Sequence, residues 1–262
     1  MGRAIVITSG KGGVGKTTST ANIGASLARR GHSVVLLDAD IGLRNLDVVM
    51  GLENRIVFHL VDVITGKCTA EKALIKDRRV EGLFLLPSSQ TDEKDAVTPE
   101  QTRKLVNQLK RNHDFVLIDC PAGIERGFQN AIAGADEAII VATPEVSSIR
   151  DADRVAGLLA THDIPARLVV NRISKALVKR GDMLSQEDVV DILALELLGA
   201  VPLDDAIVAS TNRGIPATLD GRSEAVREFD RITARIIGEE VVMEVHPGFF
   251  ARLGRALGLS AA

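Results

Sequence analysis

The segment from Gly10 to Thr17, Gly-Lys-Gly-Gly-Val-Gly-Lys-Thr, combines glycines with a lysine and a hydroxyl at the spacing of a phosphate-binding loop. It follows a β-branched apolar run, residues 4–8, and precedes a helix-forming stretch, residues 19–30. In a strand, loop and helix of this kind, backbone N–H groups gather at the helix N-terminus and bind nucleotide phosphates. We therefore expect Lys16 to reach the β- and γ-phosphates, and the Thr17 hydroxyl to ligate Mg²⁺.

Three aspartates follow apolar runs and are candidates for magnesium and water chemistry. Asp119 ends the run 115–119, as a magnesium-binding carboxylate would; a cap for the next turn is the other interpretation. Asp38 and Asp40 end a second run. We place Asp38 beside Mg²⁺ and Asp40 beside the attacking water, where orientation matters more than basicity. An ordinary loop aspartate is the alternative for Asp40. The predicted metal ligands are thus Thr17, Asp38 and Asp119, and the predicted catalytic residues include Lys16, Asp40 and Asp119.

A second lysine, Lys11, directly follows the first glycine of the loop, although phosphate binding does not by itself require it. One interpretation is a solvated loop lysine. The other is that Lys11 crosses a dimer interface and neutralises charge on the nucleotide of the partner subunit, as an arginine finger supplied in trans does. On that interpretation Lys11 is catalytic as well as nucleotide-binding. The loop residues predicted to contact the nucleotide are Lys11, Gly12, Gly13, Val14, Gly15, Lys16, Thr17 and Thr18.

Apolar runs alternate with helical patterns along the chain as far as residue 237. Further strands are expected at 33–38, 115–119, 137–143, 167–170 and 198–201, and helices at 100–111, 146–159, 185–193 and 222–237. This alternation predicts a single-domain α/β fold over residues 1–237, with a mostly parallel twisted sheet and helices on both faces. Ligands bind at the carboxyl ends of the strands in such sheets, and the phosphate loop and the three aspartates all fall there.

The composition is that of a globular protein without a strong overall charge. The 262 residues are 45% hydrophobic and 26% charged, and the net charge is −3. No general basic surface is therefore expected to recruit nucleic acid. The two cysteines lack the spacing of metal ligands. The N-terminal residues do not resemble a signal peptide, so we expect a cytoplasmic protein.

The last residues form a separate feature. Residues 238–248 are acidic at first and then contain His-Pro-Gly, which breaks a helix and predicts a linker. In residues 249–262, a helix would align Phe249, Leu253 and Leu257, with Phe250 beside them and two arginines on the other side. We expect an amphipathic segment that lies on an anionic membrane surface; a last core helix is the alternative. Because one such tail binds marginally, two tails on a dimer would act together.

The sequence from Lys11 to Thr18 resembles the loop of the deviant Walker-A ATPases, the P-loop family of MinD and ParA. The likeness to the MinD branch extends through residues 38–47, 121–125, 144–148 and 180–185, and covers nearly the whole chain. The resemblance implies an ATP- and Mg²⁺-dependent hydrolase in which Lys11 is the signature lysine and the nucleotide lies between two subunits. It also implies that Asn171 and Pro202 contact adenine, and that Arg44 and Asp151 lie on a partner-binding face. The other interpretations are a strand-end amide that satisfies a turn for Asn171, and solvated surface charges for Arg44 and Asp151.

The resemblance further implies a role in cell division. We expect a homodimer with ATP that cycles onto the inner face of the cell membrane, positions the division septum, recruits the inhibitor MinC, and is stimulated by a topological factor such as MinE. A ParA-like DNA-partition ATPase and a MinD-like flagellar-number ATPase are the alternatives. The acidic net charge and the tail weigh against DNA partition. An electron-transfer protein like the nitrogenase iron protein would need cluster cysteines, which Cys68 and Cys120 do not supply.

Overall fold

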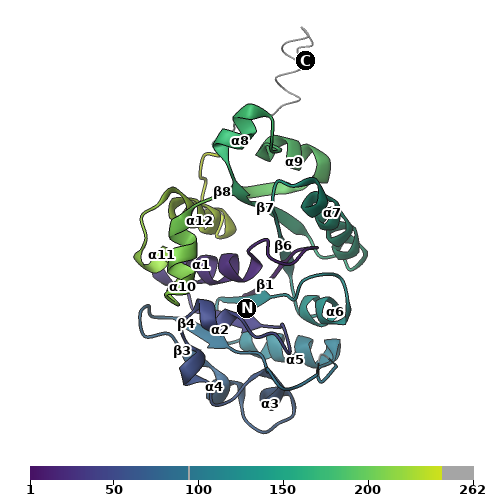
Figure 1. Cartoon of the computed structure of the whole chain (residues 1–262). Coiled ribbons are helices and arrows are strands. Elements are labelled where there is room, and N and C mark those ends of the chain that lie inside the picture. The colour runs from purple at the N-terminus through teal and green to yellow at the C-terminus, as the bar shows by residue number, and fades with distance from the viewer. Residues whose placement is uncertain (94, 244–262) are drawn as a thin grey trace.

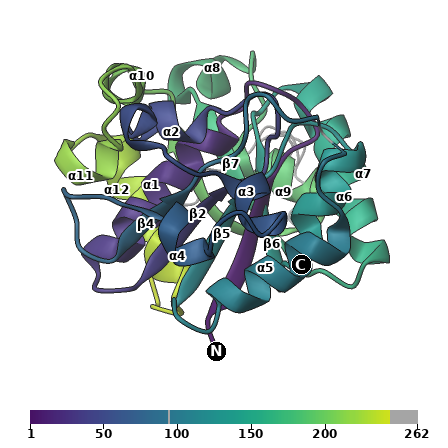
Figure 2. The ribbon, with the colours of Figure 1, turned by 90° about the horizontal axis from the view of Figure 1, so that it is seen from below.

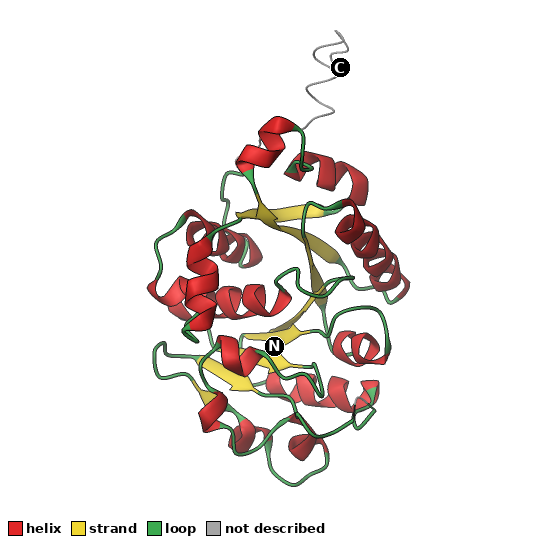
Figure 3. Ribbon diagram, viewed as in Figure 1, coloured by secondary structure: helices red, strands yellow, loops and turns green. Residues whose placement is uncertain are grey.

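The computed structural model describes residues 1–93 and 95–243, which form an eight-stranded sheet between two layers of helices (Figures 1 and 3). The strand order is β3-β4-β2-β5-β1-β6-β7-β8. Every neighbouring pair is parallel except β3 with β4. The strands are β1 (Arg3–Thr8), β2 (Val34–Asp38), β3 (Ile75–Lys76), β4 (Leu83–Leu86), β5 (Phe115–Asp119), β6 (Glu137–Ala142), β7 (Ala166–Ile173) and β8 (Glu196–Pro202). The predicted mostly parallel α/β fold is confirmed.

Helices cover both faces of this sheet, as Figure 2 shows from below. One face is covered by α3 (Leu60–Ile64), α4 (Ala70–Ala73), α5 (Pro99–Leu109), α6 (Arg126–Ile132), α7 (Val146–Thr161) and α9 (Gln186–Leu193). The other is covered by α1 (Lys16–Arg29), α2 (Leu46–Val49) and α12 (Glu224–Ile236), with α10 (Asp205–Asn212) and α11 (Ala217–Asp220) nearby. The 3₁₀ turn η1 (Glu53–Arg55) and α8 (Lys175–Arg180) complete the described elements.

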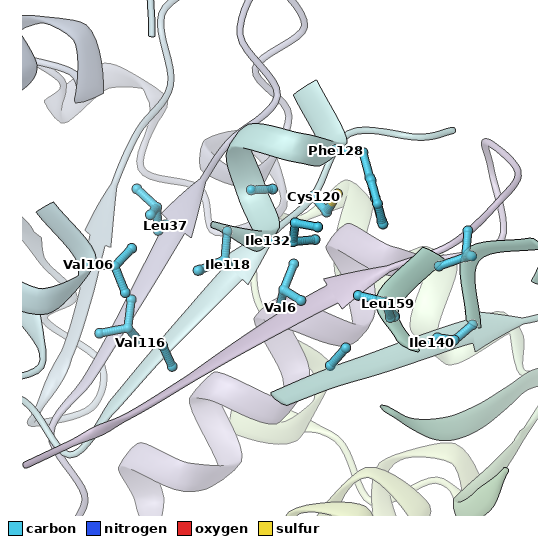
Figure 4. Packing of buried hydrophobic residues seen from close by; sticks show 14 of the residues in the cluster. Val6, Leu37, Val106, Val116, Ile118, Cys120, Phe128, Ile132, Ile140 and Leu159 are labelled. Carbon is cyan, nitrogen blue, oxygen red and sulfur yellow. The ribbon is translucent and has the colours of Figure 1, made fainter. Parts of the chain in front are cut away.

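Alternate residues of the central strand β1 point into two different cores. Val6 belongs to the cluster that includes Val106 of α5 and Leu159 of α7, shown in Figure 4. Ile5 and Ile7 belong to the opposite cluster, which includes helices α1 and α12. All three β1 residues are fully buried. A strand covered on both faces needs apolar residues at every position, and the run that we interpreted as a buried parallel strand has them.

Several short elements were not predicted from the sequence. These are β3, β4, the 3₁₀ turn η1 and the short helices α2, α3, α4, α6, α8, α10 and α11. Helix α1 begins at Lys16 rather than at Ser19, inside the phosphate loop itself. Within the described ranges, none of the helices is long and apolar enough to cross a bilayer.

Candidate nucleotide and magnesium site

The phosphate loop connects β1 to α1 through glycines in backbone conformations that other residues rarely adopt. Gly13 has a φ of 78° and Gly15 a φ of 99°, both in the left-handed region. A Cβ on Gly15 would lie 2.3 Å from Nδ2 of Asn171, so space as well as conformation demands glycine there. Val14 between them is buried and fixes the loop to the core. The loop thus delivers its N–H groups to the N-terminus of α1, as predicted.

Asp38 and Asp119 are brought together by strand pairing. They are register partners at the carboxyl ends of β2 and β5, and both are almost completely buried. Burial, reinforced by the negative charge of Asp119, raises the pKa of Asp38 above its usual range. Burial also raises the pKa of Asp119, opposed by a hydrogen bond with Thr17 and by the charge of Lys16. The charge of Lys16 thus only partly offsets the cost of burying the two carboxylates side by side.

A magnesium ion fits this arrangement of buried carboxylates. Mg²⁺ is held in such sites by one or two carboxylates together with phosphate oxygens and waters, and it would offset the repulsion between Asp38 and Asp119. Thr17 already lies within hydrogen-bond reach of Asp119. Among the described residues no group of three or more His, Cys, Asp or Glu side chains is placed to hold a metal, so this site would depend on two carboxylates, the Thr17 hydroxyl and the nucleotide. When bound, Mg²⁺ would neutralise charge that develops on the phosphates in phosphoryl transfer.

The protein holds both carboxylates in fixed orientations. Asp38 accepts hydrogen bonds from the backbone N–H groups of Asp40, Asn45 and Leu46, at 3.0, 3.3 and 3.2 Å. Asp119 accepts a 3.3 Å hydrogen bond from the Thr20 hydroxyl. Thr20 was not among the predicted residues. Its position one helical turn after Lys16 was the available signal, because that spacing places both on one face of α1.

Asp40 lies on the wall of a pocket between two loops. The pocket has an empty volume of about 420 Å³, opens to solvent, and is lined by residues 39–41 and by residues of 121–130. Gly123, in the second of these segments, has a φ of 89°, and no atom lies within 4 Å of the position that a Cβ would take. Asp40, the predicted water-positioning residue, therefore lies between two segments that are far apart in the sequence. Such a place can seat a water and can change shape on hydrolysis.

Lys11 contacts the start of α7. Its Nζ lies 3.2 Å from Oγ of Ser147 and 3.7 Å from a carboxylate oxygen of Glu145, at the start of α7. The Lys11 side chain is 45% exposed, whereas Lys16 is buried. The two lysines of the loop thus occupy different environments. Of the two, Lys16 lies near enough to Asp119 for its charge to lower the pKa of that carboxyl.

Asn171 contacts the phosphate loop directly. Its Nδ2 donates a 2.7 Å hydrogen bond to the carbonyl of Val14, and its Oδ1 accepts one from the N–H of Arg172. This bracing of the loop was not predicted. Pro202 ends β8, next to β7, and is half-buried. Asn171 and Pro202 therefore lie at the same edge of the sheet, and their contact with adenine stays a prediction.

The two predicted partner residues occupy different settings. Nε of Arg44 lies 2.7 Å from a carboxylate oxygen of Asp47, which is fully buried, so the guanidinium is largely engaged within the chain. Asp151 of α7 is half-buried against Gly10, where a Cβ on the glycine would lie 2.3 Å from the Asp151 carbonyl oxygen. The predicted membrane residues Phe249, Phe250, Leu253 and Leu257 lie outside the described residues.

Comparison with known proteins decides the family. A family model described as an AAA domain matches residues 2–161. The septum site-determining protein MinD of Bacillus subtilis is 50% identical over 266 residues, covering 99% of each chain. The chain belongs to the MinD family of septum site-determining proteins. Members of the MinD family are P-loop ATPases, and this chain is an Mg²⁺-dependent ATPase with the family's α/β fold.

Two solved structures of the MinD family overlay closely on this fold. The MinC:MinD cell division complex of Aquifex aeolicus contains a chain that is 50% identical with a TM-score of 0.87, covering 93% of this chain and 99% of that one. The MinD of Pyrococcus horikoshii, complexed with Mg-ADP, is 30% identical with a TM-score of 0.83, covering 91% and 97%. The nucleotide and metal predicted from the loop and the aspartates, ATP and Mg²⁺, are confirmed for the MinD family.

Proposed function

We propose that this chain is an ATP-controlled switch for placing the division septum. In the proposed cycle, ATP assembles a homodimer, the dimer binds the inner face of the cell membrane through the C-terminal segment, and hydrolysis releases it. The observation that supports the proposal is the position of Lys11, whose exposed side chain contacts Ser147 and Glu145 at the start of α7. A lysine so placed can serve a nucleotide held by a second subunit.

The partners of the switch are proposed from the family. A MinD that is 50% identical forms a complex with MinC in Aquifex aeolicus, which supports recruitment of a MinC by this chain. A stimulating factor such as MinE belongs to the same proposal. Asp151 is our candidate contact for a partner, because a protein that binds α7 there would act on helix and phosphate loop together. Asp153 on the same helix is exposed, and its substitution provides the matched control for substitution of Asp151 in a test of partner binding.

Sedimentation with anionic liposomes tests the membrane part of this function. The full chain is compared with a chain ending at Pro247, each with ATP, with ADP and without nucleotide. We expect sedimentation of the full chain with ATP only, and none of the shortened chain. Binding that ignores nucleotide or survives truncation would contradict the proposed membrane cycle.

Two further measurements test the dimer and separate the alternatives. Light scattering after gel filtration should show a dimer with ATP, and Lys11→Ala should reduce it. A gel shift with duplex DNA at low salt, with ATP present, should show no binding, because the net charge of −3 offers no general attraction to phosphate. ATP-dependent binding to DNA would instead support a partition ATPase.

A further inference from the structure

The orientation of Asp38 depends on the position of helix α2. Two of its three hydrogen bonds come from the N–H groups of Asn45 and Leu46, at the start of that helix. The helix spans four residues, Leu46–Val49, which is a single turn. Such a short helix is not stable by itself and must be held by the rest of the protein. Whatever holds α2 therefore also sets the Asp38 carboxylate.

Arg79 holds the C-terminal end of α2. Its Nη2 donates a 2.5 Å hydrogen bond to the carbonyl of Met50, the residue that directly follows the helix. Its Nη1 donates a 2.7 Å hydrogen bond to the carbonyl of Gly214, in the loop after α10. Helix α2 lies beside α10 (Figures 1 and 2). One guanidinium thus joins two loops that are far apart in the sequence.

The Arg79 guanidinium is itself fixed by a buried carboxylate. Its Nε lies 2.9 Å from Oδ1 of Asp77, and Nη2 lies 2.5 Å from Oδ2. Asp77 is 1% exposed, so its charge needs this partner. A planar fork that pairs with a carboxylate and still donates to two carbonyls is specific to arginine, since lysine has a single nitrogen.

The same junction leaves little freedom for the backbone. Gly51 follows Met50 with a φ of 60°, and a Cβ on it would lie 2.5 Å from the Gly214 carbonyl oxygen. The loop after α2 and the loop after α10 are therefore in close backbone contact at the point where Arg79 bonds to both. Loss of the guanidinium would allow these loops to separate and α2 to shift.

We propose that Arg79 is a positioning residue for magnesium, because its hydrogen bonds to Met50 and Gly214 fix α2 and thereby the Asp38 carboxylate. The inference rests on the proposed role of Asp38 as a magnesium ligand. Arg79 contacts neither the nucleotide loop nor the metal carboxylates in any hydrogen bond of the described residues. Substitution of Arg79 should therefore weaken the binding of Mg²⁺ and leave the binding of nucleotide without metal unchanged.

The test uses the full chain and a fluorescent ATP analogue, bound first in EDTA and then over a titration with Mg²⁺. The variants are Arg79→Ala, Arg79→Lys, Asp38→Asn and the control Arg78→Ala, which removes an exposed arginine next to Arg79. For both Arg79 variants we expect unchanged affinity in EDTA and a Mg²⁺ half-saturation that rises by about tenfold or more, as for residues that orient metal ligands. Arg78→Ala should match the unsubstituted protein.

The remaining outcomes separate the inference from the assignment on which it rests. If Asp38→Asn shifts the Mg²⁺ titration but Arg79→Lys does not, the role of Arg79 is wrong and that of Asp38 stands. If Asp38→Asn has no effect, Asp38 is not a ligand and the inference fails with it. Arg79→Lys keeps a positive charge beside Asp77 and decides the matter if Arg79→Ala does not fold. Failure of both to fold, or an equal loss of affinity in EDTA, would assign Arg79 a general structural role and overturn the proposal.

Discussion

Nζ of Lys11 lies 3.2 Å from Oγ of Ser147 in the first turn of α7 of the same subunit. The two segments meet a second time where Gly10 packs against Asp151. Two contacts thus join the phosphate loop to α7. The polar contact between side chains can break, whereas the close backbone contact can loosen only if the loop moves. The lysine is held, but its side chain remains 45% exposed, where the partner of the proposed dimer could reach it.

Lys11→Ala should abolish turnover while leaving the binding of ATP to the monomer intact. The reason is that Lys11 is directed toward Ser147 and Glu145, so its loss removes nothing from the phosphate contacts of its own loop. We expect kcat to fall by about 10³ or more, as on loss of a trans-acting finger. ATPase rate and equilibrium binding of ATP are the measurements. Lys16→Ala is the contrast, because it should weaken binding itself; equal loss of binding in both variants would refute the distinction.

Gly15→Ala should prevent nucleotide binding. The new Cβ would lie 2.3 Å from Nδ2 of Asn171, and the φ of 99° would be strained in addition. Gly31→Ala is a matched control, since its φ is 89° and nothing lies within 4 Å of the new Cβ. The control should lose only about 1–2 kcal/mol of unfolding free energy and bind ATP normally. Calorimetric titration with ATP and thermal melting measure the two effects.

Asn171→Ala should weaken the binding of ATP and of inorganic tripolyphosphate alike, by about tenfold. The lost bond is the one to the Val14 carbonyl, and a buried carbonyl without its partner costs roughly 1–3 kcal/mol. Competition of both ligands against a fluorescent nucleotide measures the effect. If only ATP is affected, Asn171 acts through adenine alone and the bracing of the loop has no energetic weight.

Mg²⁺ should stabilise the nucleotide-bound protein more as the pH rises. The folded-state pKa values of Asp38 and Asp119 lie above the ordinary value of 3.8, so the native state holds protons that the unfolded state releases. Without metal, their contribution to stability is present below about pH 4 and is lost as the pH rises through the raised pKa values. Mg²⁺ replaces those protons. Thermal melting in EDTA and in Mg²⁺ should therefore diverge with increasing pH, and Asp38→Asn should reduce the divergence.

Arg235→Ala should destabilise the fold by about 2–3 kcal/mol. Arg235 donates hydrogen bonds to the carbonyls of Leu198, Val241 and Val242. It also pairs with the buried carboxylate of Glu228 at 3.2 Å. Its loss leaves several acceptors without a donor. Urea unfolding measures the change. Arg227→Ala removes an exposed arginine from the same helix and should stay within about 0.5 kcal/mol of the unsubstituted protein. In Arg235→Ala, but not in Arg227→Ala, residues 241–242, predicted as part of a linker, should be less protected against proteolysis.

The strands that could be predicted were those whose residues are apolar on both faces, such as β1 and β5. The strand β4, Leu83–Leu86, was missed although it is a short apolar run between Gly82 and Pro87. Helix α2 could not have been found from its own four residues. Its boundaries depend on the Asp38 carboxylate at one end and on Arg79 at the other, and both come from elsewhere in the chain.

The sequence by itself determined the chemistry of the loop, because glycine spacing, Lys16 and Thr17 are local requirements of phosphate and Mg²⁺ binding that no distant residue can supply. It also determined the alternation of the main strands and helices along the chain, through the length of its apolar runs. Only the tertiary structure decided which side chains face one another. Strand register made Asp38 and Asp119 neighbours, although 80 residues separate them, and helix packing turned Lys11 toward α7 and Asn171 onto Val14. Those contacts are long-range, and their energy exists only after the sheet and its helices have assembled.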